Sequence, residues 1–148
     1  DLYFSLLLNL KFSEISDFPD ITFNDENIIT DVGCSFYTAD DYYIINVGVT
    51  VKEDTDKIIS LIDKAINDKT YSEKEFNLIK KVLLSSVILL TEKVSRTRDS
   101  IASDVYLYGN VNYDIYNTYK NISYDEFQTF VNNLNFNNKT ITIVEKDQ

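Results

Sequence analysis

Alternating apolar and polar residues place the strongest constraint on how this chain folds. In residues 43–51 the odd-numbered side chains are apolar and β-branched residues are common. A period of two predicts a β-strand, and we expect its odd-numbered face to pack against helices. Residues 32–36 alternate in the same way, and Asp40 and Asp41 between the two runs are typical of a turn. The two runs therefore predict a β-hairpin.

The hydrophobic period changes to that of an α-helix after residue 54. The first helix predicted from it covers residues 54–68. Its apolar face consists of Ile58, Leu61, Ile62, Ala65 and Ile66. A longer helix follows over residues 72–93, where Ser72 and Glu75 match the capping-box pattern. From Val82 on this helix is apolar on more than one side, so we expect it to lie in the centre of the core.

The segments before the hairpin are less regular. Residues 2–12 are rich in leucine, with a four-residue spacing that is typical of one helical face. Residues 13–30 are polar and acidic, which predicts an irregular loop or a short helix followed by a loop. A sheet domain that opens on a helix is unusual, so we expect a strand before residue 1 to be missing.

The C-terminal half is predicted to be mainly helical. A helix begins at Ser95 and ends at Gly109 and Asn110, because both of these residues tolerate a left-handed backbone. A short helix or turn then covers residues 113–119.

A second capping box and a last strand close the chain. Ser123 and Glu126 open a helix. Its apolar face consists of Phe127, Phe130, Val131 and Leu134. Residues 140–144 alternate threonine with isoleucine, which predicts a final strand. The order α–β–β–α–α–α–α–β predicts a single α+β domain over residues 1–148, with a mostly antiparallel sheet and several helices on one face.

Composition excludes several classes of function. The chain has no histidine, so it holds neither the paired histidines of a common zinc peptidase nor a histidine base. Its 24 acidic residues outnumber 14 basic ones, which disfavours nucleic acid and anionic membranes as partners. No phosphate-binding glycine motif is present. We therefore assign no catalytic, cofactor-binding or metal-binding residue in this chain.

Several residues could be functional, but a structural role fits each of them better. Cys34, the one cysteine, lies in an apolar run and is predicted to be a buried hydrophobic residue. Asp40 and Asp41 fit a turn better than acid–base chemistry. Arg96 and Arg98 could bind a carboxylate of a partner. We expect instead that both arginines are exposed and pair with Asp99 or Glu92.

A structural role also fits two further groups better. The acidic stretch 17–26 lacks the spacing of a calcium loop. We expect most of the clustered tyrosines to pack in the domain. These are Tyr106, Tyr108, Tyr113, Tyr116 and Tyr119.

Three stretches resemble the pitrilysin/insulinase family of zinc metallopeptidases. Residues 23–36 are similar to the family's segment that runs into a Gly-Tyr strand, and residues 71–80 (YSEKEFNLIK) to its s-x-x-E-(L/F)-x-x-x-K helix start. Residues 122–127 and 140–146 resemble its last helix and closing strand. The resemblance covers nearly the whole chain and rests on order and spacing. It implies a related α+β unit of a clamshell that encloses a peptide, with zinc held by another unit.

The family's substrate-binding residues do not carry over. Some members have an arginine and a tyrosine in the pattern R-x-x-x-x-x-G-Y. When the glycine of this pattern is aligned with Gly33, Asn27 stands at the position of the arginine and Cys34 at the position of the tyrosine. Neither residue matches the pattern.

The resemblance implies a non-catalytic C-terminal domain of such a peptidase or of an inactive homologue. Its partners would be the catalytic half of the same protein, or a partner subunit, and a peptide substrate. The alternative is a free-standing acidic module that binds a basic protein and has no enzymatic role. A cytoplasmic location is the default expectation.

Overall fold

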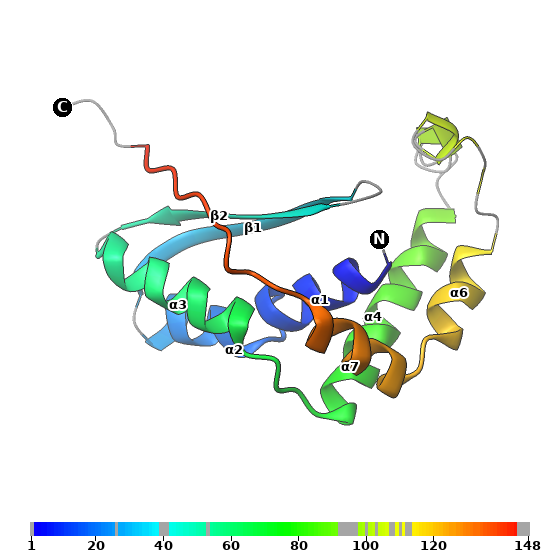
Figure 1. Cartoon of the computed structure of the whole chain (residues 1–148), viewed down its shortest axis with the longest axis horizontal. Coiled ribbons are helices and arrows are strands. Elements are labelled where there is room, and N and C mark those ends of the chain that lie inside the picture. The colour runs from blue at the N-terminus through cyan, green and yellow to red at the C-terminus, as the bar shows by residue number, and fades with distance from the viewer. Residues whose placement is uncertain are drawn as a thin grey trace.

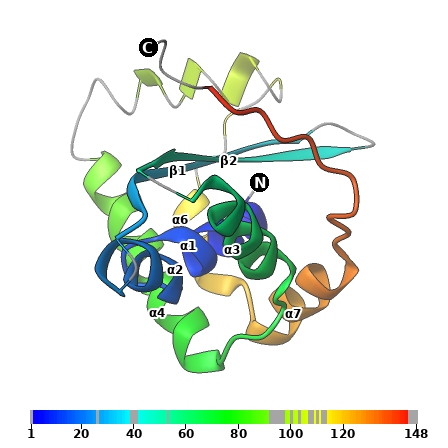
Figure 2. The same cartoon turned by 90° about the vertical axis from the view of Figure 1, so that its left-hand side faces the viewer.

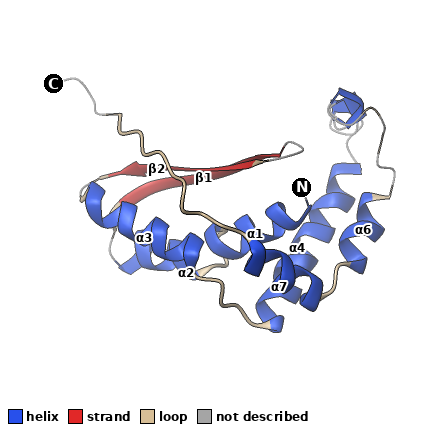
Figure 3. Ribbon diagram, in the orientation of Figure 1, coloured by secondary structure: helices blue, strands red, loops and turns tan. Residues whose placement is uncertain are grey.

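The structure is a computed structural model of an α+β domain (Figure 1). It describes residues 2–25, 27–38, 42–52, 54–91, 98–99, 101–102, 104–106, 109, 111 and 114–144. A two-stranded antiparallel sheet is covered on one side by helices, as the sequence predicts (Figure 3).

The sheet is the predicted hairpin. Strand β1 (Ile29–Thr38) pairs antiparallel with β2 (Tyr43–Val51), with Phe36 opposite Ile45. β1 begins earlier than expected, and its register shifts between Ile29 and Asp31. The predicted turn at Asp40 and Asp41 lies outside the described residues.

The two faces of β2 differ as its alternation predicts. The odd-numbered residues are half-buried against the helices, whereas the even-numbered residues are exposed. Phe36 and Ile45 pack against both hydrophobic clusters of the core and so connect them. One cluster lies under the Val51 end of the hairpin with α3 (Thr55–Asn67), and the other lies where α1 meets the C-terminal helices.

The centre of the core is α1 (Leu2–Phe12), not the helix after Ser72 (Figure 2). Leu6 and Leu7 are fully buried, and Phe4 and Leu8 nearly so. α1 packs against β1, against α4 (Glu73–Thr91) and against α7 (Tyr124–Asn133). It is buried on several sides because elements from both halves of the chain surround it.

The predicted central position of α4 is therefore wrong. Phe76 and Ile79 in its first half are buried, but Val82, Ile88 and Leu89 are exposed. Apolar residues around a whole helix predict burial only when other elements reach every side. Leu83, Leu84 and Val87 pack against the core, but the side with Val82 and Leu89 stays exposed.

The helix starts predicted at residues 54, 72 and 123 are confirmed. Glu75 and Ser72 bond reciprocally before α4, and Ser123 and Glu126 form the same capping box before α7. α3 begins at Asp54, whose carboxylate accepts a hydrogen bond from the backbone N–H of Lys57.

The acidic stretch before the hairpin contains more regular structure than expected. α2 (Asp17–Pro19) is a single helical turn, and a π-helix follows over Asp20–Asp25. The buried Thr22 hydroxyl donates to the Phe18 carbonyl, and the Ile28 N–H donates to the Thr22 carbonyl. These bonds hold the start of β1 against the end of the π-helix.

The region between α4 and α7 is described only in part. In the helix predicted from Ser95, residues 98–99, 101–102 and 104–106 are helical, while Ser95 itself lies outside the described residues. Gly109 ends this stretch as expected, with a left-handed φ of 70° and its N–H donating to the Val105 carbonyl. The short helix expected at 113–119 is α6 (Ile115–Asn121).

The final strand predicted at residues 140–144 is absent. These residues are extended but have no strand assignment, and the described part of the sheet consists of β1 and β2. The segment runs past β2 without joining it, because a groove separates the two.

Candidate functional site

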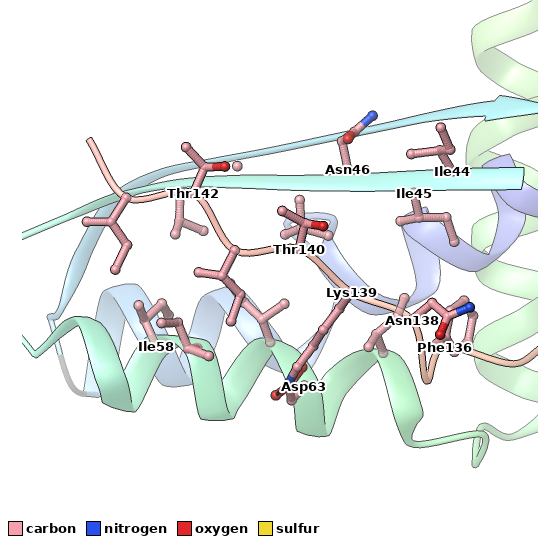
Figure 4. A pocket seen from close by; sticks show the side chains of 18 of the residues that line it. Ile44, Ile45, Asn46, Ile58, Asp63, Phe136, Asn138, Lys139, Thr140 and Thr142 are labelled. Carbon is pink, nitrogen blue, oxygen red and sulfur yellow. Dashed lines mark hydrogen bonds and ion pairs between the residues drawn. The ribbon is translucent and has the colours of Figure 1, made fainter.

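A groove runs along the edge of β2, and we name it the edge groove (Figure 4). Its walls are β2 and the segment 135–144, and its floor is one face of α3. Its volume is about 1680 Å³. Pockets for small molecules usually measure about 300–1,000 Å³, so the groove has room for a larger, elongated ligand.

The floor and the β2 wall follow directly from the two hydrophobic periods in the sequence. Ile58 is almost fully buried, and Ile62 and Ile66 continue the same face of α3 along the groove. Val47 and Val49 on the inner face of β2 pack against the same cluster. An apolar surface thus runs from the strand onto the helix.

The wall formed by residues 135–144 is held in place by hydrogen bonds at its first residues. The Tyr43 hydroxyl donates to the Asn135 carbonyl at 2.8 Å and accepts from the Asn135 N–H at 2.9 Å. Lys69 Nζ donates to the carbonyls of Asn132 and Leu134, both at 2.8 Å. These contacts fix where the chain leaves α7, so residues 135–144 run beside α3 rather than away from it.

Farther along the wall formed by residues 135–144, Lys139 forms an ion pair with Asp63 of α3 (Figure 4). These two are the charged residues among the described ones that line the groove, and they neutralise each other. Asn and Thr side chains, such as Asn46, Thr140 and Thr142, supply the other polar groups. The edge groove can therefore bind an uncharged, partly apolar segment, and it presents no acid–base pair.

The outer face of the hairpin is a second exposed surface. Tyr37, Tyr42 and Ile44 lie at one end of it and are each about half exposed. Farther along, Gly33 lies opposite Gly48. A Cβ atom added at Gly33 would meet nothing within 4 Å, so this part of the face is open backbone.

Cys34 is exposed, which corrects the prediction that it is buried. It belongs to the row of alternate residues with Val32 and Phe36, on the helix side of β1, but the helices do not cover it. Neighbouring groups still shield the thiol from water, which raises its pKa to about 11. The thiol is therefore protonated at neutral pH and is a poor nucleophile.

A smaller cavity of about 260 Å³ lies between α1, α2, α3 and α4. The buried Lys11 lines it, and burial lowers the pKa of its ammonium group although Asp68, Glu75 and Asp17 oppose this change. Burial also raises the pKa of the Tyr71 hydroxyl to about 12. The cavity is below the usual size for a ligand site, and its polar groups are dispersed over its walls.

The structure does not bring the arginines and the clustered tyrosines into one site. Arg98 pairs with Asp99 at 3.0 Å on the surface, as expected, while Arg96 lies outside the described residues. Tyr119 is buried as predicted, but Tyr106 and Tyr116 are exposed, which corrects the packing prediction for these two. The remaining two tyrosines of the cluster lie outside the described part of the chain.

The edge groove is not predicted from the sequence, although two signals pointed toward it. Residues 140–144 have strand composition, and the order of elements suggests a sheet with too few strands. Within the described residues, no group of three or more His, Cys, Asp or Glu side chains could hold a metal ion. None of the described helices is long and apolar enough to cross a membrane.

Comparison of the sequence with protein-family models and with curated proteins found no match.

Proposed function

We propose that this chain is a non-catalytic domain of a pitrilysin/insulinase-like peptidase, or of an inactive homologue, and that it helps to enclose a peptide substrate. The observation that carries the proposal is that the described helices pack on one face of the hairpin, while the even-numbered residues of β2 on the other face are exposed (Figure 3). A bare sheet face on a helix-backed unit suits the wall of a chamber.

The chemistry of the outer face fits an extended peptide. Tyr37 and Tyr42 offer two rings that are tilted by 41° to each other with centroids 6.1 Å apart, beside the exposed Ile44. Aromatic side chains provide large contact areas and are enriched where proteins bind one another. The open backbone at Gly33 and Gly48 lets a ligand approach closely.

Catalysis would belong to another part of the parent protein. This chain has no histidine, so it does not fit the zinc site of such a peptidase. The role proposed here is to bind substrate and to contact the catalytic half, in a cytoplasmic protein.

Cleavage of an unstructured peptide by the full-length parent protein, with and without a zinc chelator, tests this proposal. We expect chelator-sensitive cleavage by the parent and none by residues 1–148 alone. Absence of cleavage by the parent would favour an inactive homologue or the alternative, an acidic interaction module. Cleavage by residues 1–148 alone would contradict the proposal.

A variant of the parent tests the outer face itself. Replacing Tyr37 and Ile44 by serine should raise KM several-fold and leave kcat nearly unchanged, because binding contacts are lost equally in ground and transition states. Ile88→Ser on the exposed side of α4 is the control, since Ile88 is also about half exposed. Equal KM values for the two variants would argue against a chamber wall at this face.

A further inference from the structure

We propose that the cavity between α1, α2, α3 and α4, which we name the anchor cavity, is a docking site for a basic segment of a partner protein. The segment inserts one large apolar side chain, such as phenylalanine, and places lysine or arginine side chains around it. The four helices lie on the opposite side of the hairpin from its outer face (Figure 1). The inference therefore goes beyond the proposed function and does not depend on it.

Three exposed apolar side chains from different elements line the anchor cavity. Ile15 follows α1, Ile21 belongs to the π-helix, and Leu78 belongs to α4. Each of the three is between 37% and 50% exposed. The buried Phe18 and Ile79 continue the same apolar lining. Single apolar side chains scattered over a surface are normal, whereas several that gather around one cavity are typical of an interaction site.

The volume of the anchor cavity suits one side chain of a partner. It is about 260 Å³, which is below the roughly 300–1,000 Å³ of most small-molecule pockets. An apolar cavity of about 150 Å³ already holds a benzene ring, which has the size of the phenylalanine ring. The anchor cavity therefore has room for one aromatic side chain. A few side chains that fill such pockets carry most of the binding energy of many protein interfaces.

Carboxylate groups accompany this apolar lining. Asp17, Asp68 and Glu75 line the cavity themselves. Glu14 and Asp20 are exposed, and each is next in the chain to one of the exposed isoleucines of the lining. A partner segment that is seated in the cavity would therefore have acidic side chains on several sides of it.

The charge of this surface favours lysine and arginine in the partner. Hydrogen bonds from a neighbouring hydroxyl group, and then from a backbone N–H, lower the pKa of Asp68 and of Glu75, so both are charged at neutral pH. Of the two lysines that line the cavity, Lys11 is buried and Lys64 is exposed. The carboxylates thus outweigh the exposed positive charge of the lining, and the net charge of −10 for the whole chain has the same sign. Basic side chains on a partner would complement this surface.

Binding of a short probe peptide to the purified parent protein tests the inference. The probe is fluorescently labelled Gly-Lys-Lys-Phe-Lys-Lys-Gly, and fluorescence anisotropy measures its affinity. Two matched peptides carry serine in place of the phenylalanine, or glutamate in place of the lysines. We expect the probe to bind about tenfold or more tightly than either, because each lacks one of the two kinds of contact. Absence of probe binding would overturn the inference, and so would equal affinity for the probe and the serine peptide, since charge alone would then hold both.

Substitutions in the parent protein locate the binding site. Leu78→Ser should weaken probe binding about fivefold or more, because the lining loses an apolar contact. Leu89→Ser is the matched control, since Leu89 is also exposed on α4 but does not line the anchor cavity. Asp17→Asn should weaken binding and make the affinity less sensitive to salt.

Two outcomes of these substitutions would contradict the inference. Equal effects of Leu78→Ser and Leu89→Ser would place the probe elsewhere. Self-association of the parent protein that Leu78→Ser abolishes would make a second copy the occupant instead of a basic partner. None of these measurements involves peptide cleavage, so this inference and the proposed function can fail separately.

Discussion

Ser72 sets the start of α4 through two reciprocal bonds with Glu75. The Glu75 N–H donates to the Ser72 hydroxyl at 3.2 Å, and the Ser72 N–H donates to the Glu75 carboxylate at 2.6 Å. Hydrogen bonds from the side chain and then the backbone of Ser72 lower the pKa of the Glu75 carboxyl group. Its stabilising effect is therefore present above the pKa of the unfolded chain and is lost as the pH falls through the lower, folded value.

Ser72→Ala should lower the free energy of unfolding by about 1 kcal/mol at pH 7, the usual cost of losing a helix N-cap. The difference from the unsubstituted protein should shrink below about pH 4, because Glu75 then becomes protonated in both. Urea denaturation at several pH values measures this difference in the free energy of unfolding. Ser85→Ala, in the same helix, is the control, since the Ser85 hydroxyl donates to the Lys81 carbonyl one turn earlier and caps no helix start.

Lys11 should show the opposite dependence on pH. Burial lowers the pKa of its ammonium group from the ordinary 10.5, so the unfolded chain binds more protons between the two values. The contribution of Lys11 to the free energy of unfolding is lowest at a pH where its ammonium group is charged. It rises as the pH increases from the folded pKa to the unfolded pKa. Lys11→Met should therefore be more stable than the unsubstituted protein at pH 7, and the gap should narrow toward pH 10.5. A gap that widens with pH in denaturant titrations would contradict the pKa shift.

At the scale of elements, the central position of α1 makes a direct prediction. Leu6→Ala should lower the free energy of unfolding by about 3–5 kcal/mol, because a fully buried leucine leaves a cavity. Leu89→Ala in α4 should change it by less than about 0.5 kcal/mol, because that side chain is 59% exposed. Comparable losses from both variants, measured by chemical denaturation, would restore α4 to the centre of the core.

Elements whose signals are local were predictable from the sequence. The alternation of β2 determined which face packs, and the Ser72 and Ser123 patterns identified helix starts, because a cap and a pleat involve residues only a few positions apart. The burial of α1 was not predictable in this way. Leu6 is buried by elements from both halves of the chain, and no periodicity near residue 6 encodes their positions.

At the scale of the whole molecule, the sequence predicted the fold class but not the candidate site. The strand pattern of residues 140–144 is strong, yet a strand also needs a neighbour, and β2 lies across the edge groove. Cys34 shows the same limit, since its apolar run gave no sign that the helices leave β1 uncovered at that point. Both errors concern what lies beside an element, which depends on tertiary arrangement.

The central position of α1 also has a consequence during synthesis. Its Tyr3 ring stacks on Phe127 with centroids 6.2 Å apart, so its partners leave the ribosome long after it does. At about 5–20 residues per second, roughly 120 intervening residues correspond to a delay of about 6–24 s. For that time the leucine-rich start of the nascent domain is without α7, which makes α1 the segment that a chaperone at the ribosome exit would bind.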